Sequence, residues 1–380
     1  MEIYLDNAAT TKPSEECLKD YVEAAKKYWA NPSSVYQPAI EARTAIEHAR
    51  EQCAKSINAN PEEIIFTSGG SEGNNMLIHG IEYYYENPTY FYSQLEHPSM
   101  LKAIESTISP TLVDIPVRQD GLIDLNVLEH SLKHIRYSYN FVVIQLANNE
   151  IGTIQDIKDI STIAHNYHAR VIVDAVQAYM HIPIDVKEMG IDAMVVSGHK
   201  FGALRGTGFI YLNKRLKIAP MIWGGHQEID MRAGTENTAG IVALGNQVER
   251  ICENIEHSMS RIDSARKDLL IAISNMCKKN NWHYKVNGSY FSRLPNNLSI
   301  TFEGVKASDL VTLLGDRGIY ISAGSACSSG ESVPSKTLKA IGLTDDEARS
   351  TVRFTINDIL TPSQIEYIKE NLEACIKILK

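Results

Sequence analysis

A lysine that follows a buried strand is the first candidate for chemistry in this sequence. Residues 194–196 (Met-Val-Val) are an apolar run typical of a buried strand, and Ser197, His199 and Lys200 follow it. An amine held there by a rigid element can point into a cleft, and partial desolvation then lets it attack a carbonyl to form a Schiff base. Ser197 and His199 offer hydrogen bonds suited to an anion. Because a single lysine is more often a solvated loop residue, Lys200 needs support from elsewhere in the chain.

The elements that must position this lysine form a repeating pattern of short apolar strand, polar loop and helix. The strands that we expect are 63–67, 89–94, 141–146, 170–174, 193–197 and 208–212. Near-continuous valine and isoleucine runs separated by helices indicate a mostly parallel sheet covered on both faces. In such sheets ligands bind beyond the carboxyl ends of the strands, so the residues after each strand deserve most weight.

The residues after the other strands add groups that complement the lysine. Residues 68–72 (Ser-Gly-Gly-Ser-Glu) open a helix, where free N–H groups beside Gly70 and Ser71 suit a phosphate. The other groups are Glu96 and His97, Asn148 to Glu150, and Asp174 with Gln177. Taken singly, these are helix caps, turns or loop residues. Together, an anion cradle, an aromatic base, an amide, a carboxylate and a lysine match the groups of pyridoxal 5'-phosphate (PLP).

Two features of the C-terminal part could also take part in chemistry. Residues 322–330 are nine consecutive small residues around one thiol, Cys327. We expect a mobile loop there, and composition alone leaves a flexible linker with an incidental cysteine equally open. Residues 351–356 alternate with period two, which predicts a strand. Its Arg353, on the face away from the core, either binds a carboxylate through two parallel hydrogen bonds or forms a surface ion pair.

Composition limits the classes of protein to consider. The chain has 380 residues, enough for two domains, and a formal net charge of −9 without a lysine- or arginine-rich block, which argues against nucleic-acid binding. It has no apolar run of the roughly 18 residues that span a membrane, and its start lacks the features of a signal peptide. Six scattered cysteines without a Cys-x-x-Cys pair suggest reduced thiols in a cytoplasmic protein and no metal site.

The expected division is a large domain and a smaller α+β domain. A long helix over 238–275, which we expect to be kinked, carries the chain out of the large domain near residue 255. The large domain then comprises residues 15–255. The smaller one comprises 1–14 and 256–380 and carries the cysteine loop at about 322–335.

The motifs together resemble the cysteine desulfurases of the NifS/IscS type, PLP-dependent enzymes of the class V aminotransferase family. The resemblance implies the aspartate aminotransferase-like fold, fold type I, and the long loop around Cys327 is similar to that of the first group of these enzymes. The matching stretches occur in family order over nearly the whole chain: residues 4–11, 66–72, 96–97, 148–152, 173–177, 197–200, 232–237, 324–327 and 352–354.

This resemblance implies that Lys200, His97 and Cys327 are catalytic, that Asp174 binds the cofactor and that Arg353 binds the substrate. Lys200 would hold PLP as a Schiff base and shuttle protons, Asp174 would pair with the pyridinium nitrogen, and His97 would stack on the ring and take part in proton transfer. Arg353 would bind the carboxylate of L-cysteine. Cys327, as a thiolate, would attack the substrate sulfur, which leaves a persulfide on the enzyme and releases alanine.

The resemblance also implies the rest of the site and its partners. Gln177 and Asn149 would bind the phenolic oxygen or lie beside the substrate. The phosphate would be bound by Gly70, Ser71, Ser197 and His199, with Thr235 reaching in from the second subunit of a homodimer. The sulfur would pass to an acceptor protein, either an iron–sulfur scaffold or a tRNA-thiolation enzyme. Both stay open because the sequence ends at Lys380 without the tail by which IscS-like members dock a scaffold.

Two departures and two alternatives accompany this interpretation. Residues 201–206 (Phe-Gly-Ala-Leu-Arg-Gly) replace the Gly-Pro-containing turn of the family, which allows the lysine loop a different course, and Ser71 replaces threonine but keeps a hydroxyl. A selenocysteine lyase or another class V PLP aminotransferase or lyase needs no sulfur-accepting cysteine. A non-catalytic, partner-binding relative predicts no PLP chromophore, and the presence of Lys200, Asp174 and Cys327 disfavours it.

Overall fold

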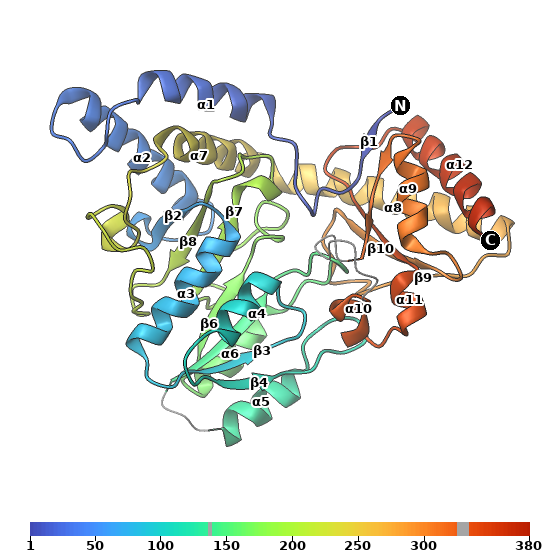
Figure 1. Ribbon diagram of the computed structural model, residues 1–380, viewed down its shortest axis with the longest axis horizontal. Helices are drawn as coiled ribbons and strands as arrows, with labels where there is room; N and C mark the ends of the chain where they lie inside the picture. Colours follow the sequence, from blue (N-terminus) through green and yellow to red (C-terminus); the bar gives the residue numbers. More distant parts are fainter. Residues whose placement is uncertain (136–138, 325–333) are drawn as a thin grey trace.

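A seven-stranded sheet organises the N-terminal region. The computed structural model describes residues 1–135, 139–324 and 334–380, and it orders the strands β2-β8-β7-β6-β5-β3-β4 (Figure 1). In this sheet β8 runs antiparallel to β2 and β7, and the other described pairs are parallel, which confirms the predicted mostly parallel sheet. The strands are Ile64–Thr67 (β2), Thr89–Tyr92 (β3), Thr111–Asp114 (β4), Asn140–Gln145 (β5), Arg170–Asp174 (β6), Ala193–Ser197 (β7) and Gly208–Leu212 (β8).

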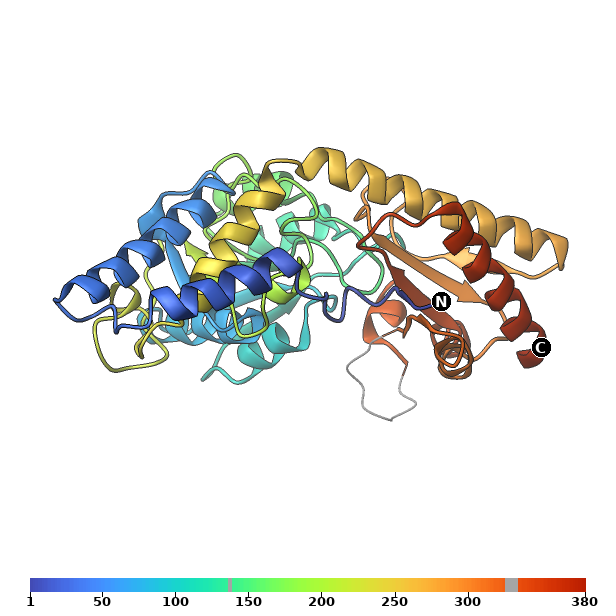
Figure 2. The same cartoon turned by 90° about the horizontal axis from the view of Figure 1, so that it is seen from above.

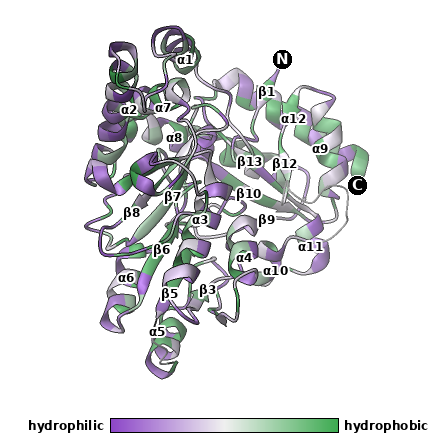
Figure 3. Cartoon of the chain, turned by 60° about the vertical axis from the view of Figure 1, so that its left-hand side comes forward, coloured by the Kyte–Doolittle hydropathy of each residue, from purple (hydrophilic) through white to green (hydrophobic). Residues whose placement is uncertain are grey.

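Helices cover both faces of this sheet because its strands are apolar on both sides. Val171 and Val173 of β6 belong to one hydrophobic cluster, and Ile172 between them belongs to another on the opposite face. The first face is covered by Glu15–Lys27 (α1), Gln37–Lys55 (α2), Leu125–His134 (α5), Ile157–Asn166 (α6) and Thr238–Cys252 (α7). The second is covered by Gly70–Tyr84 (α3) and Pro98–Glu105 (α4). Figure 3 shows the apolar residues gathered on the central strands.

The C-terminal region is built on an antiparallel sheet with the order β12-β13-β10-β9. Its strands are Tyr284–Val286 (β9), Asn297–Phe302 (β10), Ser322–Ala323 (β12) and Thr351–Thr355 (β13). Ile255–Lys279 (α8), Ala307–Gly315 (α9) and Pro362–Leu379 (α12) pack against it through one hydrophobic cluster. Lys336–Ala340 (α10) and Asp345–Arg349 (α11) complete this region.

The N-terminal segment connects the two regions. Ile3–Tyr4 (β1) pairs in parallel with Ile319–Tyr320 (β11), and Ile3 and Leu5 join the hydrophobic cluster of the C-terminal region. Both chain ends therefore lie in this region, and α8 runs from the large sheet into it (Figure 2). Within the described part of the chain, no helix is both long and apolar enough to cross a membrane.

Two local predictions differ from the structure. The helix expected over 238–275 is two helices, α7 and α8, because the backbone leaves helical geometry at Asn254 (φ −139°, ψ 18°). Strand β4 was not predicted, because this edge strand is only half buried and lacks a continuous apolar run. Edge strands of this kind carry a weak sequence signal.

Candidate active site

Lys200 lies directly after β7, in the short 3-10 turn Gly198–Lys200 (η2). Its Nζ donates hydrogen bonds to the carbonyl oxygens of Ala8 (2.8 Å) and Ala9 (2.9 Å). The loop after it is tied to the same N-terminal segment, since Gly202 N donates to Thr11 Oγ1 (2.7 Å) and Thr11 Oγ1 donates to the His199 carbonyl (3.0 Å). Segment 6–14 therefore passes over the carboxyl end of β7 and holds the lysine.

Asp174, the last residue of β6, is a buried carboxylate with only 1% of its surface exposed. Its Oδ1 accepts from Val176 N (3.0 Å) and its Oδ2 accepts from Asn74 Nδ2 (3.0 Å). Both donors are neutral, so the negative charge is hydrogen-bonded but is not cancelled by these donors. A carboxylate in this state suits a cationic N–H group of a ligand.

His97 is the N-cap residue of α4, where Pro98 fixes the first helical position. Its Nδ1 accepts from Ser99 N (3.1 Å) and lies 2.7 Å from Ser99 Oγ. Burial lowers the pKa of His97 below its ordinary value, Asp174 opposes this shift and Lys200 adds to it. The ring is therefore neutral near pH 7, and the charges of Asp174 and Lys200 both influence its pKa.

Glu96, next to His97, is a second buried carboxyl group at this end of the sheet. Burial, with a smaller contribution from the charge of Asp174, raises the pKa of Glu96 to about 8. Its Oε1 accepts from Ser93 Oγ (3.0 Å). Glu96 is therefore largely protonated at neutral pH.

The glycine loop and the end of β7 lie side by side where the anion cradle is predicted. Gly69 has φ +145°, a conformation that glycine adopts readily, and a Cβ built on Gly70 would lie 2.9 Å from Val176 Cγ2. A Cβ on Gly69 would lie 3.3 Å from Ser197 Oγ, so the Ser197 hydroxyl lies beside the first turn of α3. The N–H groups of that turn have no partner inside the helix, and Ser71 is exposed beside them.

His199 faces the N-terminal segment rather than the glycine loop. Its Nδ1 lies 3.1 Å from Thr10 Oγ1. Burial, with smaller effects from Lys200 and Arg205, lowers the pKa of His199 to about 4. The imidazole is thus a neutral hydrogen-bonding group, and its predicted phosphate contact stays a prediction.

Arg353 of β13 is buried, with 2% of its surface exposed, so it is not a surface ion pair. Its Nη2 donates to Asp6 Oδ1 (2.6 Å) and its Nη1 donates to the Asn149 carbonyl (2.9 Å). Within the described residues the buried Nε has no hydrogen-bond partner. This arginine therefore joins the two regions of the molecule, and it retains donor capacity that a ligand carboxylate could use.

Gln177 and Asn149 lie close to these groups. Gln177 Nε2 donates to the Ala8 carbonyl (2.9 Å), which also accepts from Lys200. Asn149 Oδ1 accepts a long bond (3.4 Å) from Gln145 Nε2. Both side chains are near the lysine or the arginine, but their predicted contacts with a phenolic oxygen or a substrate stay predictions.

Cys327 and Thr235 are not placed in the site by this single chain. Cys327 belongs to residues 325–333, outside the described residues. Ser322 pairs with Arg353 in the sheet, and Ser335 Oγ donates to Glu150 Oε2 (2.5 Å). Thr235 is exposed in the loop before α7, and its entry into a second subunit's site stays a prediction.

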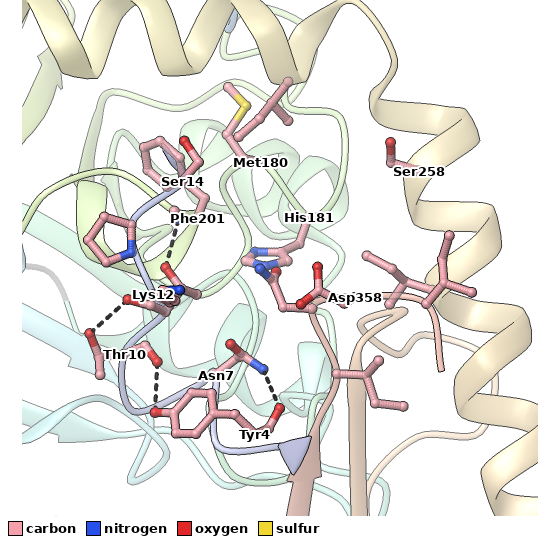
Figure 4. Close-up of a pocket in the computed structure, with 18 of the residues that line it drawn as sticks. Tyr4, Asn7, Thr10, Lys12, Ser14, Met180, His181, Phe201, Ser258 and Asp358 are labelled. Carbon is pink, nitrogen blue, oxygen red and sulfur yellow. Dashed lines mark hydrogen bonds between the residues drawn. The ribbon is translucent and has the colours of Figure 1, made fainter. Parts of the chain in front are cut away.

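A cleft of about 1190 Å³ lies on the far side of the N-terminal segment. Asn7, Thr10, His181 and Asp358 are among its lining residues (Figure 4). Lys200 does not line it, because segment 6–14 separates the two: Ala8 and Ala9 face the lysine while Asn7 and Thr10 face the cleft. The predicted residues therefore meet beside this cleft and not in it.

The family of this chain follows from comparison with known proteins. Residues 3–368 match the aminotransferase class-V family. The chain belongs to this family. It is 37% identical over 383 residues to the cysteine desulfurase IscS of Dictyoglomus turgidum, an alignment that covers 100% of this chain and 95% of that protein. It is 34% identical to the IscS of Methanosarcina thermophila over 382 residues, covering 100% and 93% of the two chains.

Solved structures of NifS-like proteins show the same fold over 99–100% of this chain. A NifS-like protein superposes with a TM-score of 0.91 at 29% identity and full coverage of both chains. A NifS-like protein from Rickettsia africae gives a TM-score of 0.89 at 31% identity, covering 99% of this chain and 100% of that one. The predicted fold type I architecture is therefore confirmed.

Three residues that contact the predicted site residues had no predicted role: Asn74, Ser99 and Asp6. Asn74 lies one helical turn after Gly70, a spacing that already placed it on the same face of α3. Ser99 follows His97 by two residues at a helix start, where side chains commonly bond to backbone. Asp6 carried no such signal, because its partner Arg353 is 347 residues away.

Proposed function

We propose that this chain removes sulfur from L-cysteine with PLP as its cofactor, and that the reaction takes place around Lys200. The observation that carries the proposal is the arrangement of Asp174 and Lys200 at the ends of the neighbouring strands β6 and β7. The IscS relatives, and a solved SspA complex with cysteine that is 31% identical (TM-score 0.80, 94% and 99% coverage), support this substrate.

The residues present fit the cofactor. Asp174 offers an anion to a ring N–H, the cradle at Gly70 leaves no room for a side chain, and Lys200 provides the amine. Ser71, Ser197, His199 and, from a second subunit, Thr235 would complete the phosphate site. PLP, when bound, supplies an aldehyde for the substrate amine and an electron sink for the bonds at its Cα.

The chain's own residues would then bind the substrate and move protons. Arg353 would bind the substrate carboxylate, using its unpaired Nε and exchanging Asp6 for the new anion. Lys200 would leave the Ala8 and Ala9 carbonyls and carry protons at Nζ. His97 would act as a neutral imidazole, and Gln177 and Asn149 would fix the ligand's orientation.

Cys327 would accept the sulfur. Its thiolate sulfur would bond to the substrate sulfur as the substrate Cβ–S bond breaks. The electron pair of that bond stays with the substrate carbon, which takes up a proton and leaves as alanine, while the enzyme retains a persulfide. Ser322, shortly before the segment that contains Cys327, pairs with Arg353 in the sheet, which supports this role.

The remaining proposals concern organisation. We propose domains of residues 15–255 and of residues 1–14 with 256–380, because Ile3 and Leu5 share the core of the C-terminal region. We also propose a cytoplasmic homodimer that passes sulfur to an iron–sulfur scaffold or a tRNA-thiolation enzyme. Analytical ultracentrifugation of the full chain tests the dimer.

Cys327→Ala tests the reaction class. We expect this variant to bind PLP and to lose sulfur release from L-cysteine, whereas Cys252→Ala, which removes an exposed thiol, keeps it. Unchanged sulfur release by Cys327→Ala would exclude the desulfurase mechanism. Retained selenide release from L-selenocysteine, with no release from L-cysteine in the parent chain, would support a selenocysteine lyase.

A further inference from the structure

A buried asparagine lies between the two catalytic groups Asp174 and His97. Asn74 of α3 has 1% of its surface exposed. Its Nδ2 donates one proton to Asp174 Oδ2 (3.0 Å) and the other to Ser99 Oγ (2.9 Å). One amide group therefore contacts the last residue of β6 and the first turn of α4 at once.

The orientation of this amide follows from the charge beside it. A flipped amide would place Oδ1 against the carboxylate of Asp174, where two acceptors repel each other. In the orientation present, Oδ1 is buried without a hydrogen-bond partner among the described residues. An unpaired buried acceptor is destabilising, and the two donor contacts offset this cost.

Ser99 connects Asn74 to His97 through its hydroxyl group. Because Ser99 Oγ accepts from Asn74, its own proton is free to point at His97 Nδ1, 2.7 Å away. The Ser99 backbone N–H donates to the same Nδ1 (3.1 Å). With two donors facing Nδ1, that atom is an acceptor, and the proton of the neutral ring sits on Nε2.

We propose that Asn74 is a positioning residue that orients the Asp174 carboxylate and, through Ser99, holds His97 as its Nε2–H tautomer. Proton exchange at His97 then uses Nε2, while Nδ1 is reserved for the helix cap. The consequence for catalysis rests on the proposed function, but the tautomer and its dependence on Asn74 are properties of the chain itself.

Nitrogen-15 NMR of the PLP-free protein tests the tautomer without any reaction. We expect His97 to show a protonated Nε2 and an unprotonated Nδ1, and we expect Asn74→Ala and Ser99→Ala to give a mixture of tautomers. Asn140→Ala is the matched control, because Asn140 is also buried with an unpaired Oδ1 but lies at the opposite end of β5. A proton on Nδ1 in the parent chain, or a tautomer unchanged in both variants, would overturn the proposal.

PLP titration tests the link to Asp174. We expect Asn74→Ala to bind PLP about tenfold more weakly, as the loss of one hydrogen bond to a charged group predicts. The double variant Asn74→Ala/Ser99→Ala should bind PLP no more weakly than Asn74→Ala alone, because coupled residues are not additive. The proposed network would be contradicted if the losses of PLP affinity were additive in the double variant, or if Asn140→Ala lost as much affinity as Asn74→Ala. A parent chain that binds no PLP would instead refute the proposed function and leave the NMR result standing.

Discussion

Two buried aspartates, Asp174 and Asp192, lie at opposite ends of the neighbouring strands β6 and β7. They have different partners. Asp174 closes β6 at the carboxyl end and accepts from two neutral donors, Asn74 Nδ2 and Val176 N. Asp192 precedes β7 at the opposite end, with 5% of its surface exposed. It accepts from Arg170 Nη1 (3.1 Å), His165 Nε2 (2.9 Å) and Val171 N (2.9 Å).

Two buried arginines show the same difference. Arg50 donates through Nη1 and Nη2 to Glu228 (2.8 and 3.0 Å) and through Nε to Glu47 (3.1 Å). Arg353 has one carboxylate partner, Asp6, and an unpaired Nε among the described residues. Burial alone does not distinguish a structural charge from a functional one. The structural charges are neutralised within the fold, and the site charges keep capacity for a ligand.

Replacement of the lysine at the site end should have the largest effect. We expect Lys200→Ala to lower sulfur release from L-cysteine at least about a thousandfold, because the amine is both attachment point and proton carrier. Its free energy of unfolding should change by less than about 1 kcal/mol. Lys158→Ala, which removes an exposed ion pair with Glu188, serves as the control and should keep full activity. If Lys200→Ala released sulfur at the rate of the parent chain, the reaction would not take place around Lys200.

Asp174→Asn should affect mainly activity, whereas Asp192→Asn should affect mainly stability. We expect Asp174→Asn to lower kcat/KM about a hundredfold with little loss of stability, since its charge serves a ligand. Asp192→Asn should lower the free energy of unfolding by about 1–3 kcal/mol, because it removes the buried carboxylate that accepts from Arg170, His165 and Val171, and should leave the activity of the folded enzyme unchanged. Urea unfolding and steady-state kinetics measure both. Equal effects of the two substitutions on activity would break the comparison.

The two arginines should separate in the same way, with a smaller effect. Arg353→Lys removes the paired donors that bind a carboxylate, so we expect KM for L-cysteine to rise about thirtyfold while kcat changes little. Arg50→Lys should instead lower the melting temperature and leave KM unaltered. An unchanged KM in Arg353→Lys would mean that the substrate carboxylate binds elsewhere.

The smallest effect concerns pH and the buried His181. Burial lowers the pKa of His181 to about 4, while an unfolded histidine titrates near 6.5. Between these values the unfolded chain binds more protons, so stability present above pH 6.5 is lost as the pH falls toward 4. At pH 5 the loss is about 2 kcal/mol.

The matched variants isolate this contribution. His181→Gln should lose about 2 kcal/mol less than the parent chain when urea unfolding is compared at pH 7 and pH 5. His165→Gln, which replaces a histidine with 40% of its side chain exposed, serves as the control. Parallel curves for the parent and His181→Gln would show that His181 takes up its proton without unfolding.

Much of this molecule could be predicted from its sequence, for physical reasons. The valine and isoleucine runs of β5, β6 and β7 are buried on both faces, and the rule that ligands bind at strand ends then places Asp174 and Lys200 together. The pairing of Arg353 with Asp6 could not be predicted, because it depends on β1 packing beside β11. The position of Asn74 between β6 and α4 likewise depends on packing across the sheet.

The most direct test of the central claim is mass spectrometry of the PLP-loaded enzyme after one turnover with L-cysteine. We predict one alanine per active site and a gain of one sulfur atom on the peptide that contains Cys327, and we predict neither product in Lys200→Ala. Two results would contradict the account. One is the formation of alanine without a gain of sulfur on the Cys327 peptide, and the other is a PLP-loaded enzyme that does not consume L-cysteine.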